Sequence, residues 1–244
     1  MADVTIYGAG VIGLTLAWEC LKRGATVQVI DPHGVAAGAS GGVVGALAPH
    51  VPENWNAKKA FQLDSLLMAR SLWPEIEEAS GLSTGYVRSG RVQPLADARA
   101  VELARGREES AKELWADHAE WYVQDAARHH PWLNHSATDL VVYDTLSAHI
   151  HPRRGLTALA AAIRARGGRI EPTAEPSGQV VHCTGWQGLL DLSADMGRSV
   201  GTGVKGQAAL FQCDAGSVPQ LFVDSLHIIP HNDGTVAIDR KSVV

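Results

Sequence analysis

Cysteine is scarce in this chain, and the few cysteines are widely spaced. Only Cys20, Cys183 and Cys213 occur among 244 residues, and no two of them form a Cys-x-x-Cys pair. This spacing gives neither a disulfide framework nor a thiolate metal motif. We therefore expect a reduced, cytoplasmic protein.

Long apolar runs and a strong charge of one sign are also lacking. No apolar run approaches the roughly 20 residues that cross a bilayer, and the first strand begins too close to Met1 for a signal sequence. The net charge of -5 favours neither nucleic acid nor an anionic membrane as a partner. Hydrophobic residues at 45% can fill the core of one large or two small domains. The oligomeric state stays open, a homo-oligomer included.

The most informative stretch is residues 4–31, which has the pattern of a strand, a glycine-rich turn, a helix and a second strand. In such a turn the first glycine permits a tight bend, the second lets the backbone approach a pyrophosphate, and the third lets the helix pack closely. The candidate residues are Gly8, Gly10, Val11, Ile12 and Gly13. Asp31 follows about twenty residues later, where an acid binds the ribose hydroxyls. We predict a bound adenine dinucleotide, with an empty turn as the alternative.

A second unusual stretch, residues 32–49, consists largely of small residues. It is too apolar for a linker and too poor in side chains for a core, so it suits a close approach of backbone to a flat or charged ligand. The alternative is a glycine-rich surface loop. The candidate cofactor-binding residues here are Pro32, Ala39, Ser40, Gly45, Ala46 and Leu47.

These motifs together resemble the start of the D-amino-acid oxidase and glycine oxidase family of FAD-dependent oxidoreductases. In that family a small-residue segment runs along the pyrophosphate and under the flavin ring, and nicotinamide enzymes with the same first turn lack it. The resemblance therefore implies FAD as the cofactor. It also implies oxidation of a small amine or amino acid, of D-amino acid or glycine type, by hydride transfer to the flavin.

Residues 179–186 are similar to a second signature of the same family, a hydrophobic strand that is closed by Thr-Gly and an aromatic residue. We expect a buried strand followed by a tight turn in which the backbone meets the dinucleotide again. The candidates are Thr184, Gly185 and Trp186. For Trp186 core packing is an equally good interpretation.

The predicted fold class is α/β, a Rossmann-like FAD-binding domain with an inserted α+β substrate domain. We expect the FAD-binding domain at residues 1–83 and 147–198, and the substrate domain at residues 84–146 and 199–238. Residues 239–244 are polar and unlike the strand and closing segment with which family members continue. This difference suggests an atypical tail on a truncated chain.

Three residues are predicted on the substrate side, namely His50, Lys205 and His231. Relatives similar to glycine oxidase often have an arginine at the position of His231, and histidine would hold a carboxylate more weakly and in a pH-dependent way. His149 and His151 alternate along a predicted strand without a nearby acid, so we expect structural histidines and no metal site.

Two hypotheses compete with a flavin-dependent oxidase. One is a catalytically silent nucleotide-binding protein, or a fragment whose uncovered sheet edge is covered by a partner chain. The other, weaker one is a nicotinamide-dependent dehydrogenase. The substrate and the electron acceptor are not specified by the sequence.

Local patterns predict several elements outside these motifs. Residues 57–76 have the spacing of a helix that Pro74 should kink or stop. Ser89-Gly90 has the pattern of a hairpin turn between two short strands. Asp97 is placed to cap a charged helix, and residues 226–238 should form a second hairpin.

Overall fold

The computed structural model describes residues 1–129 and 135–240. The chain forms two compact units, which we call unit 1 and unit 2. Unit 1 contains Met1–Gly42, Trp73–Thr84 and Pro152–Lys205, and unit 2 contains Val43–Leu72, Gly85–His151 and Gly206–Val244. Each unit has its own sheet and its own core.

Unit 1 is built on a parallel sheet with the strand order β8-β2-β1-β9. Its strands are β1 (Val4–Tyr7), β2 (Val27–Ile30), β8 (Arg169–Glu171) and β9 (Gln179–His182). Because all four strands are parallel, their carboxyl ends lie at one edge of the sheet. This is the edge at which ligands bind in open α/β sheets.

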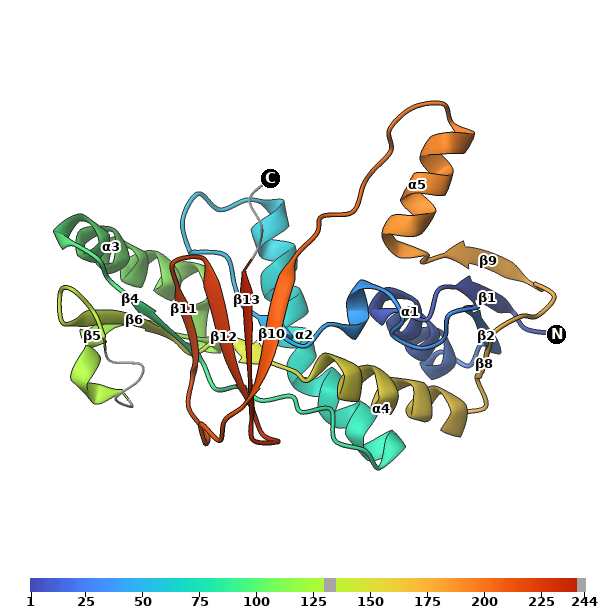
Figure 1. The fold of residues 1–244 in the computed structure, drawn as a ribbon, viewed down its shortest axis with the longest axis horizontal. Helices are drawn as coiled ribbons and strands as arrows, with labels where there is room; N and C mark the ends of the chain where they lie inside the picture. The colour runs from blue at the N-terminus through green and yellow to red at the C-terminus, as the bar shows by residue number, and fades with distance from the viewer. Residues whose placement is uncertain (130–134, 241–244) are drawn as a thin grey trace. The chain divides into compact units, whose positions relative to one another are not determined.

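Helices α1 (Val11–Lys22) and α4 (Pro152–Ala165) pack together in unit 1 and supply its core with apolar side chains (Figure 1). Trp18 and Leu159 are fully buried there, as is Ile6 of β1. The Arg166 guanidinium lies over the Trp18 ring, 4.4 Å from its centroid. The mixture of a parallel sheet and helices confirms the predicted α/β, Rossmann-like class.

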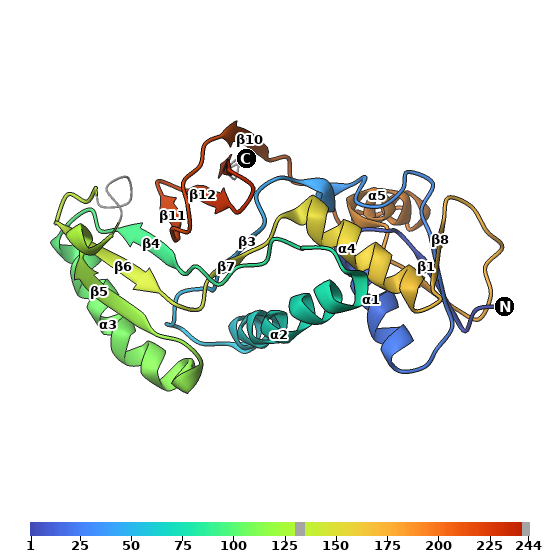
Figure 2. The same ribbon diagram turned by 90° about the horizontal axis from the view of Figure 1, so that it is seen from below.

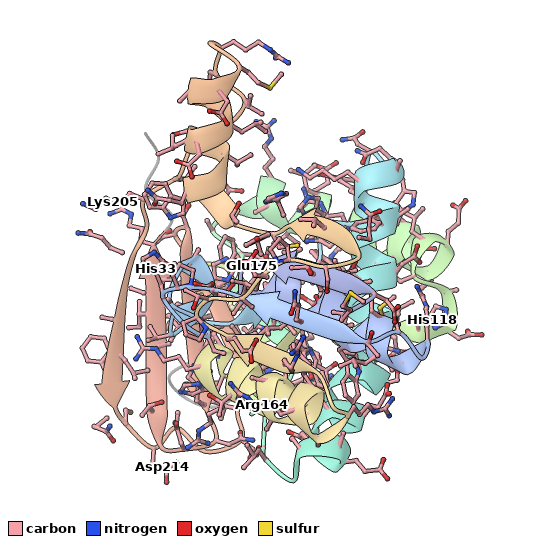
Figure 3. The ribbon with its side chains drawn as sticks, turned by 90° about the vertical axis from the view of Figure 1, so that its right-hand side faces the viewer. His33, His118, Arg164, Glu175, Lys205 and Asp214 are labelled. Carbon is pink, nitrogen blue, oxygen red and sulfur yellow. The ribbon has the colours of Figure 1, made fainter. Side chains whose placement is uncertain are left out.

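One prediction for unit 1 is wrong, because β9 is not a buried strand. It is the edge strand of the sheet, and its four residues are half-buried or exposed. Helix α5 (Gly185–Asp195) follows it and has no buried residue. Figure 3 shows α5 extending from the end of β9 with its side chains projecting outward. The apolar pattern of residues 179–186 therefore belongs to a half-buried edge strand and to the start of an exposed helix.

Unit 2 contains a seven-stranded sheet with the order β10-β13-β12-β11-β4-β6-β5 (Figures 1 and 2). The bounds are β4 (Arg91–Pro94), β5 (Trp121–Asp125), β6 (Leu140–Asp144), β10 (Gln207–Gln212), β11 (Gln220–Val223), β12 (Leu226–His231) and β13 (Thr235–Arg240). Among the described strands of this sheet, only β11 and β4 are parallel to each other. A separate two-stranded ladder joins β3 (Ala46–Leu47) to β7 (Ala148–His149).

Both faces of the β4-β6-β5 part of this sheet carry apolar clusters. Helix α3 (Ala98–Leu114) packs against one face, where Trp121 and Val142 join Ala104 and Ala111. On the other face Val92 and Val141 pack with Leu221. Side chains alternate between the faces of a strand, so neighbouring residues of β4 and β6 enter different clusters.

Two local predictions in unit 2 are confirmed. The Asp97 side chain caps α3 by accepting a hydrogen bond from the Ala100 amide at 2.8 Å. Strands β12 and β13 form the predicted hairpin. The described residues also form three short 3-10 turns, Ala39–Gly41, Ala116–His118 and Ala126–Arg128.

The hairpin predicted at Ser89-Gly90 is wrong. Residues 86–88 do not pair with β4; instead Val87 bridges to His149, and β4 pairs with β6 and β11. Long-range partners thus take the backbone hydrogen bonds that a local hairpin would have used.

The predicted helix 57–76 also ends later than expected. Helix α2 spans Ala57–Ser80 with Pro74 inside it. Proline removes one backbone hydrogen bond from the helix. Trp73 and Ile76, on either side of Pro74, are both buried, so the helix keeps its packed face beyond the proline. The helix begins in unit 2 and ends in unit 1.

The two compact units do not coincide with the expected domains. Residues 43–72 and 147–151 belong to unit 2, although we expected them in the FAD-binding domain, and residues 199–205, expected in the substrate domain, belong to unit 1. Asp239 and Arg240, expected in a tail, are paired with β10 and β12 as part of β13. Their backbone hydrogen bonds place these two residues in the sheet although their side chains are polar. Residues 241–244 lie outside the described residues. In the part of the chain that the structure describes, no helix is long and apolar enough to cross a membrane.

Candidate functional site

The glycine turn after β1 requires its glycines on steric grounds. Gly8 has a φ of +107°, and a Cβ there would lie 2.4 Å from the Cys183 carbonyl oxygen. A Cβ on Gly13 would lie 1.9 Å from the Gly8 oxygen, and one on Gly10 would lie 3.1 Å from Ser40 Oγ. The turn is therefore a cradle of bare backbone at the carboxyl edge of the sheet.

Helix α1 begins directly after this turn, and its first N–H groups face the same edge. Such groups have no partner within the helix, and they attract anions. Val11 and Ile12 are exposed there, although both side chains are apolar. Their placement fits the predicted role, in which the backbone and not the side chain binds phosphate.

Asp31 lies at the end of β2 and organises the turn. One carboxylate oxygen accepts a hydrogen bond from the Ala9 amide at 2.8 Å, and the other accepts from the His33 amide at 2.9 Å. Pro32 stands between these contacts. The carboxylate thus holds the glycine turn in place, and its binding of ribose hydroxyls stays a prediction.

The small-residue segment that contains Ala39 and Ser40 is tied to the same turn. Ser40 Oγ accepts a hydrogen bond from the Val11 amide at 3.0 Å. The Ala36 amide donates to the Ala9 oxygen at 3.0 Å, and Arg153 Nε donates to the Gly41 oxygen at 2.8 Å. Ala39 and Ser40 therefore lie at the N-terminus of α1.

The second predicted signature meets the opposite side of the same turn. Strand β9 is parallel to β1, and the Cys183 amide donates to the Tyr7 oxygen at 2.7 Å. A Cβ on Gly8 would lie 3.2 Å from the Thr184 nitrogen, so Thr184 and Gly185 start α5 beside the turn. Trp186 is 45% exposed, which argues against a role in core packing. The structure therefore brings both predicted signatures to the carboxyl end of β1.

The remaining cofactor candidates belong to unit 2. Ala46 and Leu47 form β3 and pair with β7, and the Gly45 oxygen accepts a hydrogen bond from the Ile150 amide at 3.0 Å. Their predicted place beneath a flavin ring stays a prediction.

The three residues predicted on the substrate side are divided between the two units. Lys205 is exposed at the end of unit 1, whereas His50 and His231 belong to unit 2. His231 is 5% exposed, its Nε2 lies 2.8 Å from the Val43 oxygen, and its Nδ1 is buried without a partner. This placement makes His231 a buried packing group whose role toward a substrate stays a prediction.

His149 and His151 pack with His231 in unit 2. The ring centroids are 5.7 Å apart for His149 and His231, and 4.9 Å apart for His151 and His231. Burial and the nearby His231 lower the pKa of His149 to about 4. Among residues 1–129 and 135–240 no three His, Cys, Asp or Glu side chains are grouped to hold a metal ion.

A cavity of about 700 Å³ opens in unit 2 and contains none of the predicted site residues. Its lining includes Gln93, Arg107, Trp121, Phe222 and Asp224. Arg107 is engaged in a bidentate ion pair with Glu53 at 2.9 and 2.7 Å. The cavity is lined by residues of unit 2 alone, and the dinucleotide turn of unit 1 is the better-supported site.

One group of polar residues on the α3 side of the large sheet was not predicted from the sequence. Arg91 and Asp144 form a buried ion pair, and the Phe222 ring lies 4.7 Å from the ring of His227. A charged residue within a predicted strand, Arg91, was a sign of a buried ion pair. Its partner Asp144 is 53 residues away in the sequence, so no local pattern identifies it.

Comparison with known proteins agrees with this geometry. The family model described as FAD dependent oxidoreductase (DAO) matches residues 3–241. The chain belongs to this family. The predictions of the family and of FAD as its cofactor are confirmed. The glycine turn suits that group, because a side chain at Gly8 or Gly13 would collide with neighbouring backbone and displace the turn.

Individual relatives of this FAD-dependent oxidoreductase match only in part. A Rhizobium etli protein named as thiamine biosynthesis oxidoreductase ThiO is 30% identical over 212 residues, which are 84% of this chain and 58% of that protein. The bifunctional protein ThiO/ThiG of Nostoc is 33% identical over 113 residues, 44% of this chain and 17% of that protein. The chain thus spans well under two thirds of the curated relatives that it matches.

Solved structures show the same fold at low identity. Glycine oxidase from Geobacillus kaustophilus superposes with a TM-score of 0.78 at 18% identity, covering 99% of this chain and 72% of that chain. L-amino acid deaminase from Proteus vulgaris gives a TM-score of 0.77 at 21% identity, covering 98% of this chain and 61% of that chain.

Ser40 gives the first testable prediction. Ser40→Ala removes the acceptor of the Val11 amide, so we expect the free energy of unfolding to fall by about 1 kcal/mol. Ser110→Ala is the matched control, because the Ser110 hydroxyl donates only to the Gly106 oxygen one turn earlier in α3, in an exposed hydrogen bond. Urea unfolding monitored by circular dichroism compares the two variants. Equal effects would show that the Ser40 contact adds no stability.

Proposed function

We propose that this oxidoreductase oxidises a small amine or amino acid, of glycine or D-amino acid type, with FAD as the group that accepts the hydride. The observation that supports it most strongly is the meeting of two distant signatures at the β1–α1 turn, where bare backbone faces the carboxyl edge of a parallel sheet. The names of the relatives, among them ThiO and glycine oxidase, support the substrate class.

The residues of unit 1 would act by binding and orientation. Gly10 and the first N–H groups of α1 would bind the pyrophosphate, while Asp31 and Ser40 hold the turn in shape. When bound, the flavin supplies the redox chemistry, and the substrate's amine-bearing carbon is what it oxidises. Neither a Ser-His-Asp arrangement nor a metal is needed for this class of reaction.

A second function, nucleotide binding without catalysis, is favoured by one feature of the structure. Helix α5 exposes Trp186, Leu189, Leu190 and Leu192, and all six residues of β10 are exposed. Apolar surface and a free sheet edge of this kind are usually covered by other protein. A partner chain at these elements would then be part of the working molecule.

Flavin reduction separates the two functions. The purified chain is loaded with FAD and mixed anaerobically with glycine, D-alanine or L-alanine while the visible flavin absorbance is recorded. We expect bleaching by glycine or D-alanine. Protein that takes up FAD but is bleached by none of the three supports the silent protein, and bleaching by L-alanine alone contradicts the D-type substrate. Protein that takes up no FAD contradicts both.

A further inference from the structure

One arginine of unit 2 is buried in a fixed orientation. Arg91 in β4 is 5% exposed, and its direct neighbour across the ladder, Asp144 in β6, is fully buried. Arg91 Nε donates a hydrogen bond to Asp144 Oδ2 at 3.0 Å. The other carboxylate oxygen accepts from the Ser147 amide at 2.8 Å. Because the backbone holds Asp144, the guanidinium plane is held in turn.

This arrangement uses only one of the three nitrogen atoms of the guanidinium. Within residues 1–129 and 135–240 neither Nη atom of Arg91 has a hydrogen-bond partner. Neither belongs to the buried polar atoms that lack a partner, so both reach the surface within the exposed 6% of the side chain. The paired Nη groups form the edge of arginine that donates two parallel hydrogen bonds to a carboxylate.

The surroundings of this edge are apolar and aromatic on one side. The Phe222 ring centroid lies 5.8 Å from Arg91 Cζ, and His227 stands opposite Phe222 in the neighbouring strand. Burial, and then the charge of Arg91, lower the pKa of His227. Asp239 lies opposite His227 in β13.

We propose that the Nη edge of Arg91 binds the carboxylate of a small organic acid, with Asp144 orienting the guanidinium and the Phe222 ring flanking it. The inference goes beyond the proposed function, because it assigns a ligand site that belongs to unit 2 alone. His231 does not offer such a site, because its Nε2 lies 2.8 Å from the Val43 oxygen and its Nδ1 is buried.

Two ligands of the same shape, one charged and one uncharged, test the site. Propionate and propionamide are titrated separately into the unaltered chain by isothermal titration calorimetry, without added FAD. We expect propionate to bind at least about tenfold more tightly than propionamide, because only the carboxylate makes charge-assisted hydrogen bonds. Equal affinities would overturn the proposal.

A matched pair of variants then locates the binding. Arg91→Lys keeps a cation beside Asp144 but removes the paired donors, so propionate affinity should fall about tenfold or more. Arg105→Gln removes an exposed arginine of α3 and should leave the affinity unchanged. Propionate binding that is equal in R91K and the unaltered chain, or that is lost in R105Q, contradicts the assignment.

The same experiments distinguish the site from the proposed function. If propionate binding depends on Arg91 while no amino acid bleaches the flavin, the carboxylate site stands and the oxidase function fails. If amino acids bleach the flavin while R91K binds propionate normally, the function stands and the site at Arg91 is wrong.

Discussion

Gly13→Ala is expected to abolish most FAD binding and to destabilise unit 1. The new Cβ would lie 1.9 Å from the Gly8 oxygen and 3.3 Å from the Ile6 side chain, so α1 must move away from the sheet. Overpacking of this kind costs up to about 3 kcal/mol. The movement also displaces the N–H groups that face the pyrophosphate, and we expect FAD affinity to fall about a hundredfold.

Gly106→Ala is the matched control for this substitution. Gly106 lies within α3, and a Cβ there would meet nothing within 4 Å. Alanine is the better helix former, so G106A should stabilise the protein by about 0.5 to 1 kcal/mol and leave FAD affinity unchanged. Urea unfolding and fluorescence titration with FAD measure both quantities. Normal FAD affinity in G13A would show that the turn does not hold the cofactor.

The stability of the protein is expected to fall between about pH 6.5 and pH 4 because of His149. Its pKa is about 4 in the folded chain and about 6.5 when unfolded. The depressed value means that the unfolded chain binds the proton first, so stability is complete above the unfolded pKa and is lost as the pH falls through the window. The loss approaches about 3 kcal/mol at the acid end.

The environment of His149 explains why its ring resists protonation. Nδ1 lies 3.2 Å from Ser89 Oγ, while Nε2 is buried without a partner. The ring of His231 is 5.7 Å away, and beyond it Nε2 of His151 lies 3.6 Å from the Asp233 carboxylate. That carboxylate faces His151, so it does not offset the cost of burying a charged His149. Burial also lowers the pKa of His129 and of His227, which act in the same direction.

His149→Gln tests this account, because an amide can keep a hydrogen bond to Ser89 but does not titrate in this range. Urea unfolding at about pH 7, 6 and 5 should show a smaller pH dependence for H149Q than for the unaltered chain. His118→Gln, in the exposed turn Ala116–His118, should keep the original dependence. Identical slopes for all three proteins would contradict the assignment to His149.

The dinucleotide turn was predictable from the sequence because its constraints are local. A glycine at position 13 is required by a carbonyl five residues earlier, and the acid at position 31 contacts Ala9 and His33, so short-range spacing contains the information. The cap at Asp97 is predictable for the same reason. The convergence of Ser40 and Thr184 on this turn followed only from the family resemblance.

The errors concern contacts between distant parts of the chain. The segment 86–93 has a hairpin pattern, but His149 and β6 compete successfully for its hydrogen bonds. The apolar strand 179–182 has the pattern of a central strand, yet no further strand pairs with it among the described residues. The pairing of Arg91 with Asp144 depends on register across two strands, which no local pattern specifies.

Hydrogen exchange in the presence of FAD tests the central claim most directly, namely that the two signatures of unit 1 bind one cofactor. Exchange is followed by mass spectrometry in peptides that cover residues 8–13, 38–42 and 183–186, with and without FAD. We predict that FAD slows exchange in all three together and leaves the middle of α3 unchanged. Protection of only one of the three, or of none, would contradict the account.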